Sequence, residues 1–210
     1  MSGGRNAELS REKIAAKALE VLDEVGLDGL SMRRLATELG VQSPALYWHF
    51  RDKRQLLDHM ADVIVLSAGM GPPRQGESWQ DWLARRGRGY RMALLGHRDG
   101  ARIVSTAHSL SRETIARFDQ ELAAMVALGF TPALALRTIT VVNQYVTGYV
   151  LQEQAARPAG SAAKALTPQS DERAPATVIA AIGESGGVLG QDAFEHGLHV
   201  IVHGTEILLP

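Results

Sequence analysis

The sequence predicts an all-α fold. Apolar residues recur at spacings of three and four along several segments, which is the period of an amphipathic helix, whereas segments with the alternating period of a strand are scarce. Most of these segments begin at Ser or Thr and several end at Gly, as helices commonly do. We therefore expect helices to make up nearly all of the regular structure.

The composition is that of a soluble protein with one or two domains. The chain has 210 residues, of which 45% are hydrophobic and 21% are charged. Its formal net charge is −1, so a surface for nucleic acid must be local. The lack of cysteine excludes disulfides, thiolate zinc sites and cysteine nucleophiles. The N-terminus has no signal-peptide pattern and no run of about 18 apolar residues occurs, which predicts a cytoplasmic protein without a membrane partner.

Two helices are predicted at the start of the chain. Ser10 has the side chain of an N-cap, and apolar residues follow at helical spacing until Gly26 ends the first helix. Ser31 caps a second, short helix, and Gly40 suits the left-handed residue that follows its end. A turn of only a few residues then leads to the next segment.

A third helix is predicted from Ser43, as N-cap, with Pro44 at the first helical position. Two short helices joined by a glycine-bearing turn form a helix-turn-helix, whose second helix can enter the major groove of DNA.

Three aromatic rings stand together at the end of this third helix, at Tyr47, Trp48 and His49. Leu46 and Phe50 share the inner face of the helix, which places Trp48 about 200° from Leu46 and outward. The alternative is that the rings extend the core. Between residues 31 and 55, five basic residues stand against two acidic ones, a local charge of +3. Ring tips that can reach phosphates or bases, together with this charge, favour a surface for DNA.

A resemblance to a known family rests on these residues. "LSMRRLATELGVQSPALYWHFRDKRQLLD" resembles the DNA-binding domain of the TetR family of bacterial repressors, and "GESWQDWL", "ALLGHRDGARI" and "NQYVTGYVLQEQ" resemble its tetracycline repressor branch. The resemblance implies an arm and a helix-turn-helix over residues 1–52, a connecting helix over 53–68, and a ligand-binding and dimerising domain over 69–210. It also implies a homodimer joined by a four-helix bundle from the long helix and the last helix.

The resemblance also implies which residues touch double-stranded DNA. Ser43 and Ala45 stand where the branch has a base-reading glutamine and a threonine on either side of the proline, so we expect a different operator. The aromatic positions and Lys53 match the branch. The expected contacts are Arg33, Gln42, Ser43, Pro44, Ala45, Tyr47, Trp48, His49 and Lys53.

Further helices follow from the apolar period and from Thr131-Pro132 as a helix start. They are expected over residues 79–95, 111–128, 131–154, 176–182 and 193–209. The segment 155–176 is rich in Ala, Pro, Ser and Gly and is expected to be a loop.

The resemblance places a small-molecule site in the second domain. Val104, Ala107 and His108 stand where the branch has a metal-binding histidine, a threonine and an arginine, and valine cannot ligate a hard cation. Arg86, Glu121 and Tyr90 correspond to an asparagine, a glutamine and a phenylalanine of the branch. We therefore expect an inducer other than magnesium-bound tetracycline, mostly apolar and aromatic or polyketide-like in character.

The expected ligand-binding residues are Trp82, Arg86, Tyr90, Val104, His108, Glu121, Met125, Asn143, Gln144 and Gln152, with Trp79 and Val146 as further walls. The alternative for the charged members is that Arg86 and Glu121 pair with each other or face solvent.

Catalytic and metal sites are weaker hypotheses. His97 lies two residues before Asp99, and the two could act as a catalytic base and the acid that orients it, but no GxSxG motif with a serine nucleophile occurs. The alternative is that residues 98–100 end one helix and cap the next. His196, His199 and His203 share one helical face, either as metal ligands or as core or interface residues. We expect no enzyme, no metal and no cofactor.

The sequence therefore predicts a ligand-responsive transcriptional repressor that binds a palindromic operator as a dimer and is released by a small-molecule inducer. The alternative is a DNA-binding regulator that is controlled by a protein partner, or that activates, with no small-molecule inducer.

Overall fold

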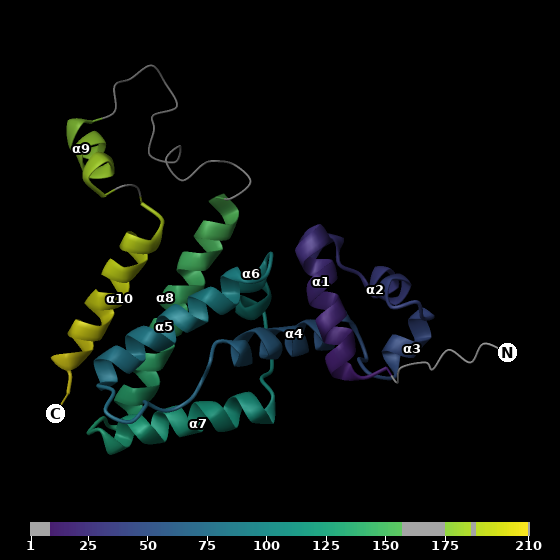
Figure 1. Ribbon diagram of the computed structural model, residues 1–210, viewed down its shortest axis with the longest axis horizontal. Helices are drawn as coiled ribbons and strands as arrows, with labels where there is room; N and C mark the ends of the chain where they lie inside the picture. The colour runs from purple at the N-terminus through teal and green to yellow at the C-terminus, as the bar shows by residue number, and fades with distance from the viewer. Residues whose placement is uncertain (1–8, 157–174, 186–187, 210) are drawn as a thin grey trace.

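The computed structural model describes residues 9–156, 175–185 and 188–209. The predicted all-α fold is confirmed, since the described residues form helices and no strand (Figure 1). The helices are α1 (Arg11–Gly29), α2 (Met32–Glu38), α3 (Ser43–Tyr47), α4 (Lys53–Ser67), α5 (Trp79–Leu95), α6 (Gly100–Ser105), α7 (Arg112–Ala127), α8 (Pro132–Ala156), α9 (Ala176–Ser185) and α10 (Gln191–Glu206). Of the predicted arm and loop, residues 1–8 and 157–174 lie outside the described part of the chain.

The first three helices form a small unit around α1, seen at the right of Figure 1. The side chain of Ser10 accepts a hydrogen bond from Lys13 N, and that of Ser31 accepts one from Arg34 N, so both predicted caps are present. Gly40 has the predicted left-handed conformation, with φ of 66°. The core of the unit consists of fully or nearly fully buried residues, among them Ile14, Leu22, Leu35, Leu46 and Phe50.

Two helix ends of this unit differ from the predictions, and later in the chain α8 ends at Ala156 rather than 154, α9 ends at Ser185 rather than 182, and α10 spans Gln191–Glu206 rather than 193–209. Gly26 has φ of 72° and interrupts α1, but one further turn continues to Gly29. In α3 the N-cap is Gln42, without a side-chain cap, and Ser43 is already helical. The reason is that Ala45 N donates to Gln42 O at 2.9 Å, which closes the first turn one residue earlier than Ser43 would.

Helix α4 connects this unit to the rest of the chain. Asp52 caps it by accepting from Gln55 N at 2.8 Å. It packs against α1 on one side and against α5, α6 and α7 on the other, as its central place in Figure 1 shows. Leu56, Met60 and Ile64 are buried in these contacts.

The larger unit is built on α8, which packs against α5, α6, α7 and α10. The predicted range of α5 coincides with the observed one, and Thr131 caps α8 by accepting from Leu134 N at 3.2 Å. Tyr145 and Tyr149 of α8 contact the ring of Phe194 on α10. Helix α9 has no buried residue and stands away from the body of the molecule in Figure 1. None of the described helices combines the length and hydropathy needed to cross a bilayer.

One histidine lies at the contact between α4 and the unit formed by the first three helices. His59 Nε2 is buried and has no hydrogen-bond partner among the described residues, and the ring lies 5.5 Å from that of Phe50. Burial lowers the pKa of His59 below its ordinary value of 6.5, and the charge of Arg11 lowers it further, while Asp62 and Glu12 act in the opposite direction.

A first prediction concerns stability against pH. Below about pH 6.5 the unfolded chain binds a proton at His59 more readily than the folded protein does, so the free energy of unfolding should fall as pH decreases from 6.5 through the lowered pKa. His59→Leu should reduce this loss, measured as the thermal midpoint between about pH 7.5 and 5, while His196→Gln, at an exposed site, should leave it unchanged. Equal pH profiles for the native protein and His59→Leu would contradict this assignment.

Candidate DNA interface and ligand pocket

The aromatic triplet lies on the surface of the helix-turn-helix as predicted from the helical period. Trp48 is 89% exposed and Tyr47 is 51% exposed, whereas Leu46 and Phe50 are fully buried. His49 is half-buried. A packed helix rarely holds two large rings in solvent. Exposed apolar surface of this kind commonly marks a binding site.

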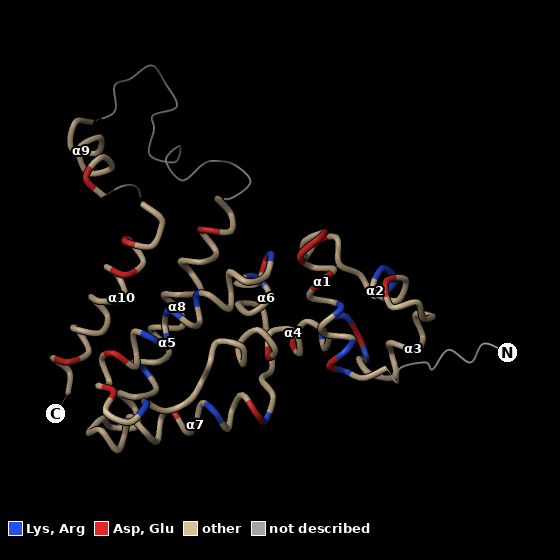
Figure 2. Tube along the Cα trace, in the orientation of Figure 1, with Lys and Arg blue, Asp and Glu red and all other residues tan. Residues whose placement is uncertain are grey.

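The other expected DNA contacts lie around this surface. Arg33, Gln42 and Pro44 are exposed, and Ser43 and Ala45 are half-buried. Basic residues of α2 and of the start of α4 are seen in blue in Figure 2. The half-buried Lys53 directs its Nζ atom to the carbonyl of Leu27 at 3.5 Å, so it lies at the junction of α1 and α4.

The loop between α5 and α6 binds the C-terminal end of α1. Asp23 contacts His97 Nδ1 at 3.0 Å and accepts from Arg98 N at 2.8 Å, and Asp99 accepts from Leu27 N at 2.8 Å. His97 and Asp99 therefore bind α1 rather than each other, which removes the geometry of a catalytic pair. Asp99 is the N-cap residue of α6, as expected for residues 98–100, but its side chain makes no capping hydrogen bond.

Two carboxylates one turn apart on α4 bind the segment between α6 and α7. Asp58 accepts from His108 N at 3.0 Å and from Ser109 Oγ at 2.9 Å. Asp62 is buried and accepts from Ser111 N at 2.9 Å and from Thr114 Oγ1 at 2.7 Å. The segment is thus attached to α4 by both backbone and side-chain donors.

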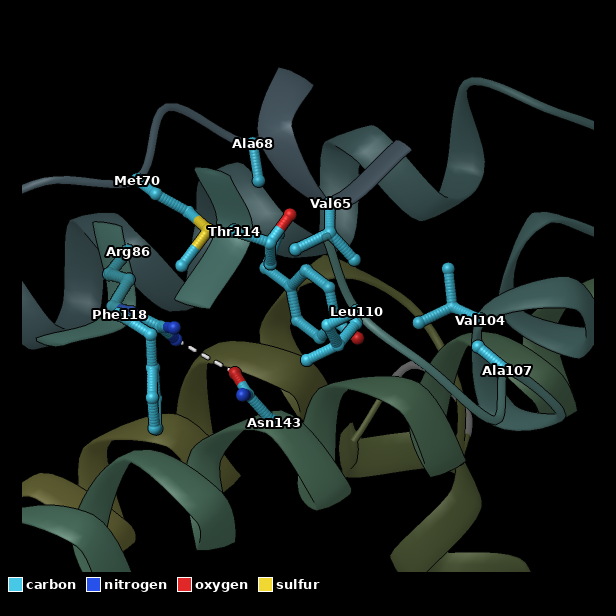
Figure 3. A pocket seen from close by; sticks show the side chains of 11 residues that line it. Val65, Ala68, Met70, Arg86, Val104, Ala107, Leu110, Thr114, Phe118 and Asn143 are labelled. Carbon is cyan, nitrogen blue, oxygen red and sulfur yellow. Dashed lines mark hydrogen bonds between the residues drawn. The ribbon is translucent and has the colours of Figure 1, made fainter. Parts of the chain in front are cut away.

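A cavity of about 310 Å³ lies between α4, α5, α6, α7 and α8 (Figure 3). Its walls are mostly apolar, which suits an organic ligand better than an ion. It is lined by Val65, Ala68, Met70, Arg86, Tyr90, Val104, Ala107, Leu110, Thr114, Phe118 and Asn143.

Four of the expected ligand-binding residues line this cavity, namely Arg86, Tyr90, Val104 and Asn143. Others do not line it: Trp82, Glu121, Met125 and Val146 are fully buried, and Trp79 packs edge-on against Phe130. The indole of Trp82 donates to the carbonyl of Gly71 at 2.9 Å, so its polar tip already has a partner.

Three expected residues lie away from the cavity. His108 is exposed and contacts Arg54 of α4, whose Nε lies 3.2 Å from His108 Nδ1. Gln144 and Gln152 are exposed on α8. On a helix, Gln144 is rotated by about 100° from Asn143. Gln152 lies nine residues after Asn143 and is rotated from it by about half a turn, so neither glutamine shares the face of Asn143.

Wall residues from α4 and α7 were not anticipated. Val65 and Ala68 come from the end of α4 and Met70 from the segment after it, where the chain has no regular period. Leu110, Thr114 and Phe118 recur every four residues. Thr114 and Phe118 lie on α7 and Leu110 just before it, so that spacing was the available signal for a shared side of this part of the chain.

The polar end of the cavity is built on a buried ion pair. Arg86 Nε lies 2.9 Å from Glu121 Oε2, with the two side chains 8% and 0% exposed. Arg86 Nη1 donates to Asn143 Oδ1 at 2.7 Å, the dashed contact in Figure 3. The backbone N–H of Gly71 donates to Glu121 Oε1 at 3.0 Å. The expected alternative, pairing of Arg86 with Glu121, is therefore what the structure has, although Arg86 still borders the cavity.

Tyr90 adds one hydroxyl to the cavity wall. Burial raises the pKa of this phenol, while a hydrogen bond with Thr147 acts in the opposite direction. The hydroxyl lies 3.2 Å from Thr147 Oγ1, so it is neutral and paired.

The three histidines of α10 lie on its exposed face, along a groove against α5. His203 Nδ1 lies 3.1 Å from the carbonyl of His199. Within the described ranges, no group of three His, Cys, Asp or Glu side chains is arranged to hold a metal ion. A core position for these histidines is excluded by their exposure.

The molecule combines a helix-turn-helix with outward aromatic residues and an all-α unit with an apolar cavity, and one helix joins them. This combination is typical of a DNA-binding regulator with a second domain that has a cavity. The chain belongs to the TetR family: the family described as bacterial regulatory proteins, tetR family, matches residues 14–60, and the tetracyclin repressor-like C-terminal domain matches residues 72–209. This family is one of transcriptional regulators, and membership of the family that the sequence resembles is confirmed.

Relatives match along nearly the whole chain. The tetracycline repressor protein class D of Escherichia coli is 36% identical over 208 residues, covering 97% of this chain and 92% of that protein. A structure of TetR (class A) in complex with 5a,6-anhydrotetracycline and magnesium has a TM-score of 0.72 at 33% identity, covering 95% and 99% of the two chains. The structure of ActR from Streptomyces coelicolor in complex with actinorhodin has a TM-score of 0.79 at 28% identity, covering 97% and 98%.

A second prediction concerns the ion pair. Arg86→Met should lower the free energy of unfolding by about 3–5 kcal/mol, because it leaves the carboxylate of Glu121 buried with only the Gly71 amide as donor. Arg86→Met combined with Glu121→Gln should recover much of that loss, measured by urea unfolding of both variants. Strictly additive effects of the two changes would show that the side chains do not depend on each other.

Proposed function

We propose that the protein is a dimeric transcriptional repressor that binds a palindromic operator and is released when a small molecule enters the cavity beside Arg86. The observation that carries the proposal is that α4 is bonded on one side to the DNA-binding unit and on the other to the segment that walls the cavity. We divide the chain accordingly into residues 1–52 for DNA, 53–68 as connector and 69–210 for ligand binding and dimerisation.

The DNA-binding part of the proposal rests on exposure and charge. Tyr47 and Trp48 project from α3, and Arg33, Arg34 and Arg51 are exposed nearby. Basic residues fix the register of a protein on the phosphate backbone, and the residues of the recognition helix then contact base edges. The half-buried Ser43 and Ala45 lie at the start of that helix and are placed to contribute to the choice of operator.

The dimer is supported by apolar surface on α8 and α10. Leu136 and Val141 of α8 are each 47% exposed, and Val200 of α10 is 55% exposed. Val141 and Val200 line a common groove between the two helices. A second copy of the chain, related by a two-fold axis, would cover these apolar faces with the same faces of its own α8 and α10. The two recognition helices would then lie about one helical turn apart along the DNA.

The signal from ligand to DNA would pass through the segment 107–114. Ala107, Leu110 and Thr114 line the cavity, and the backbone of the same segment is bonded to Asp58 and Asp62 of α4. A ligand that displaces this wall must either break those bonds or move α4. Because α4 also contacts α1, its movement changes the position of the recognition helix. The effect cannot exceed the difference in ligand affinity between the two arrangements.

The inducer differs from the magnesium–tetracycline complex. Val104 and Ala107 line the cavity where, by family resemblance, a metal-binding histidine and a threonine stand, and neither offers a ligand to a hard cation. The one carboxylate at the polar end, on Glu121, is already bonded to Arg86 and to Gly71 N. An apolar organic molecule bound without metal fits these walls.

A third prediction tests the DNA interface. Selection from a random duplex library should enrich a pseudo-palindrome with half-site centres roughly one helical turn apart. Trp48→Ala and Tyr47→Ala should each weaken binding to that sequence by about tenfold or more without lowering the thermal midpoint, because both rings point into solvent.

The matched controls are Leu46→Ala and Arg51→Ala. The first should unfold the DNA-binding unit, since Leu46 is fully buried, and the second should weaken all duplexes alike and lower the salt slope by about 1. Unfolding by Trp48→Ala, or selection of a site without symmetry, would refute the proposed interface.

A fourth prediction concerns tetracycline. Titration with tetracycline at millimolar magnesium should leave the protein on its selected duplex and should not raise its thermal midpoint, because a ligand stabilises only the state it binds. Tight binding that depends on magnesium would mean that Val104 can be tolerated where the branch has its histidine.

A further inference from the structure

The polar end of the cavity offers hydrogen-bond donors. Arg86 uses Nε to bind Glu121 Oε2 at 2.9 Å and Nη1 to bind Asn143 Oδ1 at 2.7 Å. These bonds occupy two of the five N–H groups of a guanidinium, and the others remain for a ligand in the cavity that Arg86 lines. The side-chain oxygen of Asn143 accepts a hydrogen bond from Arg86. The NH2 group of the same side chain donates to no described residue, so it is also available as a donor.

The acceptors near this end are already occupied. Glu121 Oε1 and Oε2 accept from Gly71 N and Arg86 Nε, and the side chain itself is fully buried behind the lining. Thr114 donates its hydroxyl proton to Asp62, and the Tyr90 hydroxyl is paired with Thr147. The remaining lining residues are Val65, Ala68, Met70, Val104, Ala107, Leu110 and Phe118, which offer no polar side-chain atom beyond a thioether.

The charge of the polar end is balanced. Arg86 and Glu121 together carry no net charge, and the ion pair is shielded from solvent. A cationic ligand would have to displace Arg86 from Glu121 and leave the guanidinium in an apolar cavity, which is costly. A ligand oxygen, by contrast, can accept from the free N–H groups while both existing bonds remain.

We propose that the ligand of this cavity is an aromatic or otherwise apolar molecule whose polar end is an oxygen acceptor, either a carbonyl or a carboxylate, held by Arg86 and Asn143 without a metal ion. This inference rests on the proposed function, in that the same cavity is the inducer site. A site built around buried donors selects strongly against a ligand that leaves them unpaired.

The test uses two molecules of nearly equal shape. 1-Acetonaphthone and 1-ethylnaphthalene differ by one carbonyl oxygen, and each is titrated against the fluorescence of bound N-phenyl-1-naphthylamine. The ketone should displace the reporter at about tenfold lower concentration than the hydrocarbon, relative to the same ratio in the variant that carries Arg86→Met and Glu121→Gln. That variant removes both charges together, so it leaves no unpaired buried ion.

One control variant and two charged probes complete the experiment. Val104→Trp fills the cavity and should abolish reporter binding at this site, provided that its circular dichroism spectrum and thermal midpoint match those of a folded protein. 1-Naphthoate should compete at least as well as the ketone, and 1-naphthylmethylammonium should compete poorly.

The outcomes separate the two levels of the argument. A ketone-to-hydrocarbon ratio that is the same in the native protein and in the double variant would overturn the acceptor assignment while leaving the cavity as the ligand site. Preferential binding of the ammonium probe would do the same. Reporter binding that Val104→Trp does not reduce would count against the cavity itself, and therefore against the proposed function as well.

Discussion

Helix α4 makes hydrogen bonds to both units of the molecule, and the position of the recognition helix depends on them. Its first residue, Lys53, lies against the end of α1, while Asp58 and Asp62 accept four donors from residues 108–114. Hydrogen bonds to charged acceptors contribute about 1.5–3 kcal/mol each when desolvated, and Asp62 is buried. The segment that walls the cavity therefore cannot move far without α4. The first three helices and the segment that walls the cavity are thus both bonded to one helix of fifteen residues.

A second contact between the units opposes free rotation of α4. The loop between α5 and α6 binds the same C-terminal end of α1 through Asp23 and Asp99, and Arg102 pairs with Asp28 at 2.9 Å. A Cβ atom on Gly26 would lie 3.1 Å from side-chain atoms of Arg98 and Asp99, which is a tight contact. The positive φ of Gly26 also favours glycine at this position. The C-terminal end of α1 is thus bonded both to α4 and to this loop, and a movement of α4 relative to the loop would have to break one of these contacts.

Much of this arrangement could be predicted from the sequence because its determinants are local. Ser10, Ser31 and Thr131 cap helices within three residues of themselves, and Trp48 is outward because Leu46 and Phe50 are inward. The walls of the cavity are not local. Met70 follows a helix end in a segment with glycine at 69 and 71, where no period predicts the direction of a side chain. His108 and Gln152 were expected at the cavity. A contact with Arg54, 54 residues earlier in the chain, holds His108 elsewhere, and the helical period turns Gln152 away.

The replacements at Arg86 and Glu121 can be interpreted only together. Considered alone, a buried arginine in a ligand cavity suggests an anionic ligand, and a buried glutamate suggests a cation. Either residue without the other would leave an uncompensated charge that costs about 3–5 kcal/mol, a large share of the 5–15 kcal/mol that typically stabilises a domain. Paired at 2.9 Å they cancel in charge but not in hydrogen bonding, because each carboxylate oxygen already accepts a hydrogen bond, whereas only two of the five guanidinium N–H groups donate to a described residue. Under the proposed function, the selectivity of the cavity would then depend on hydrogen-bond direction rather than on net charge, and neither residue indicates this from its own position in the sequence.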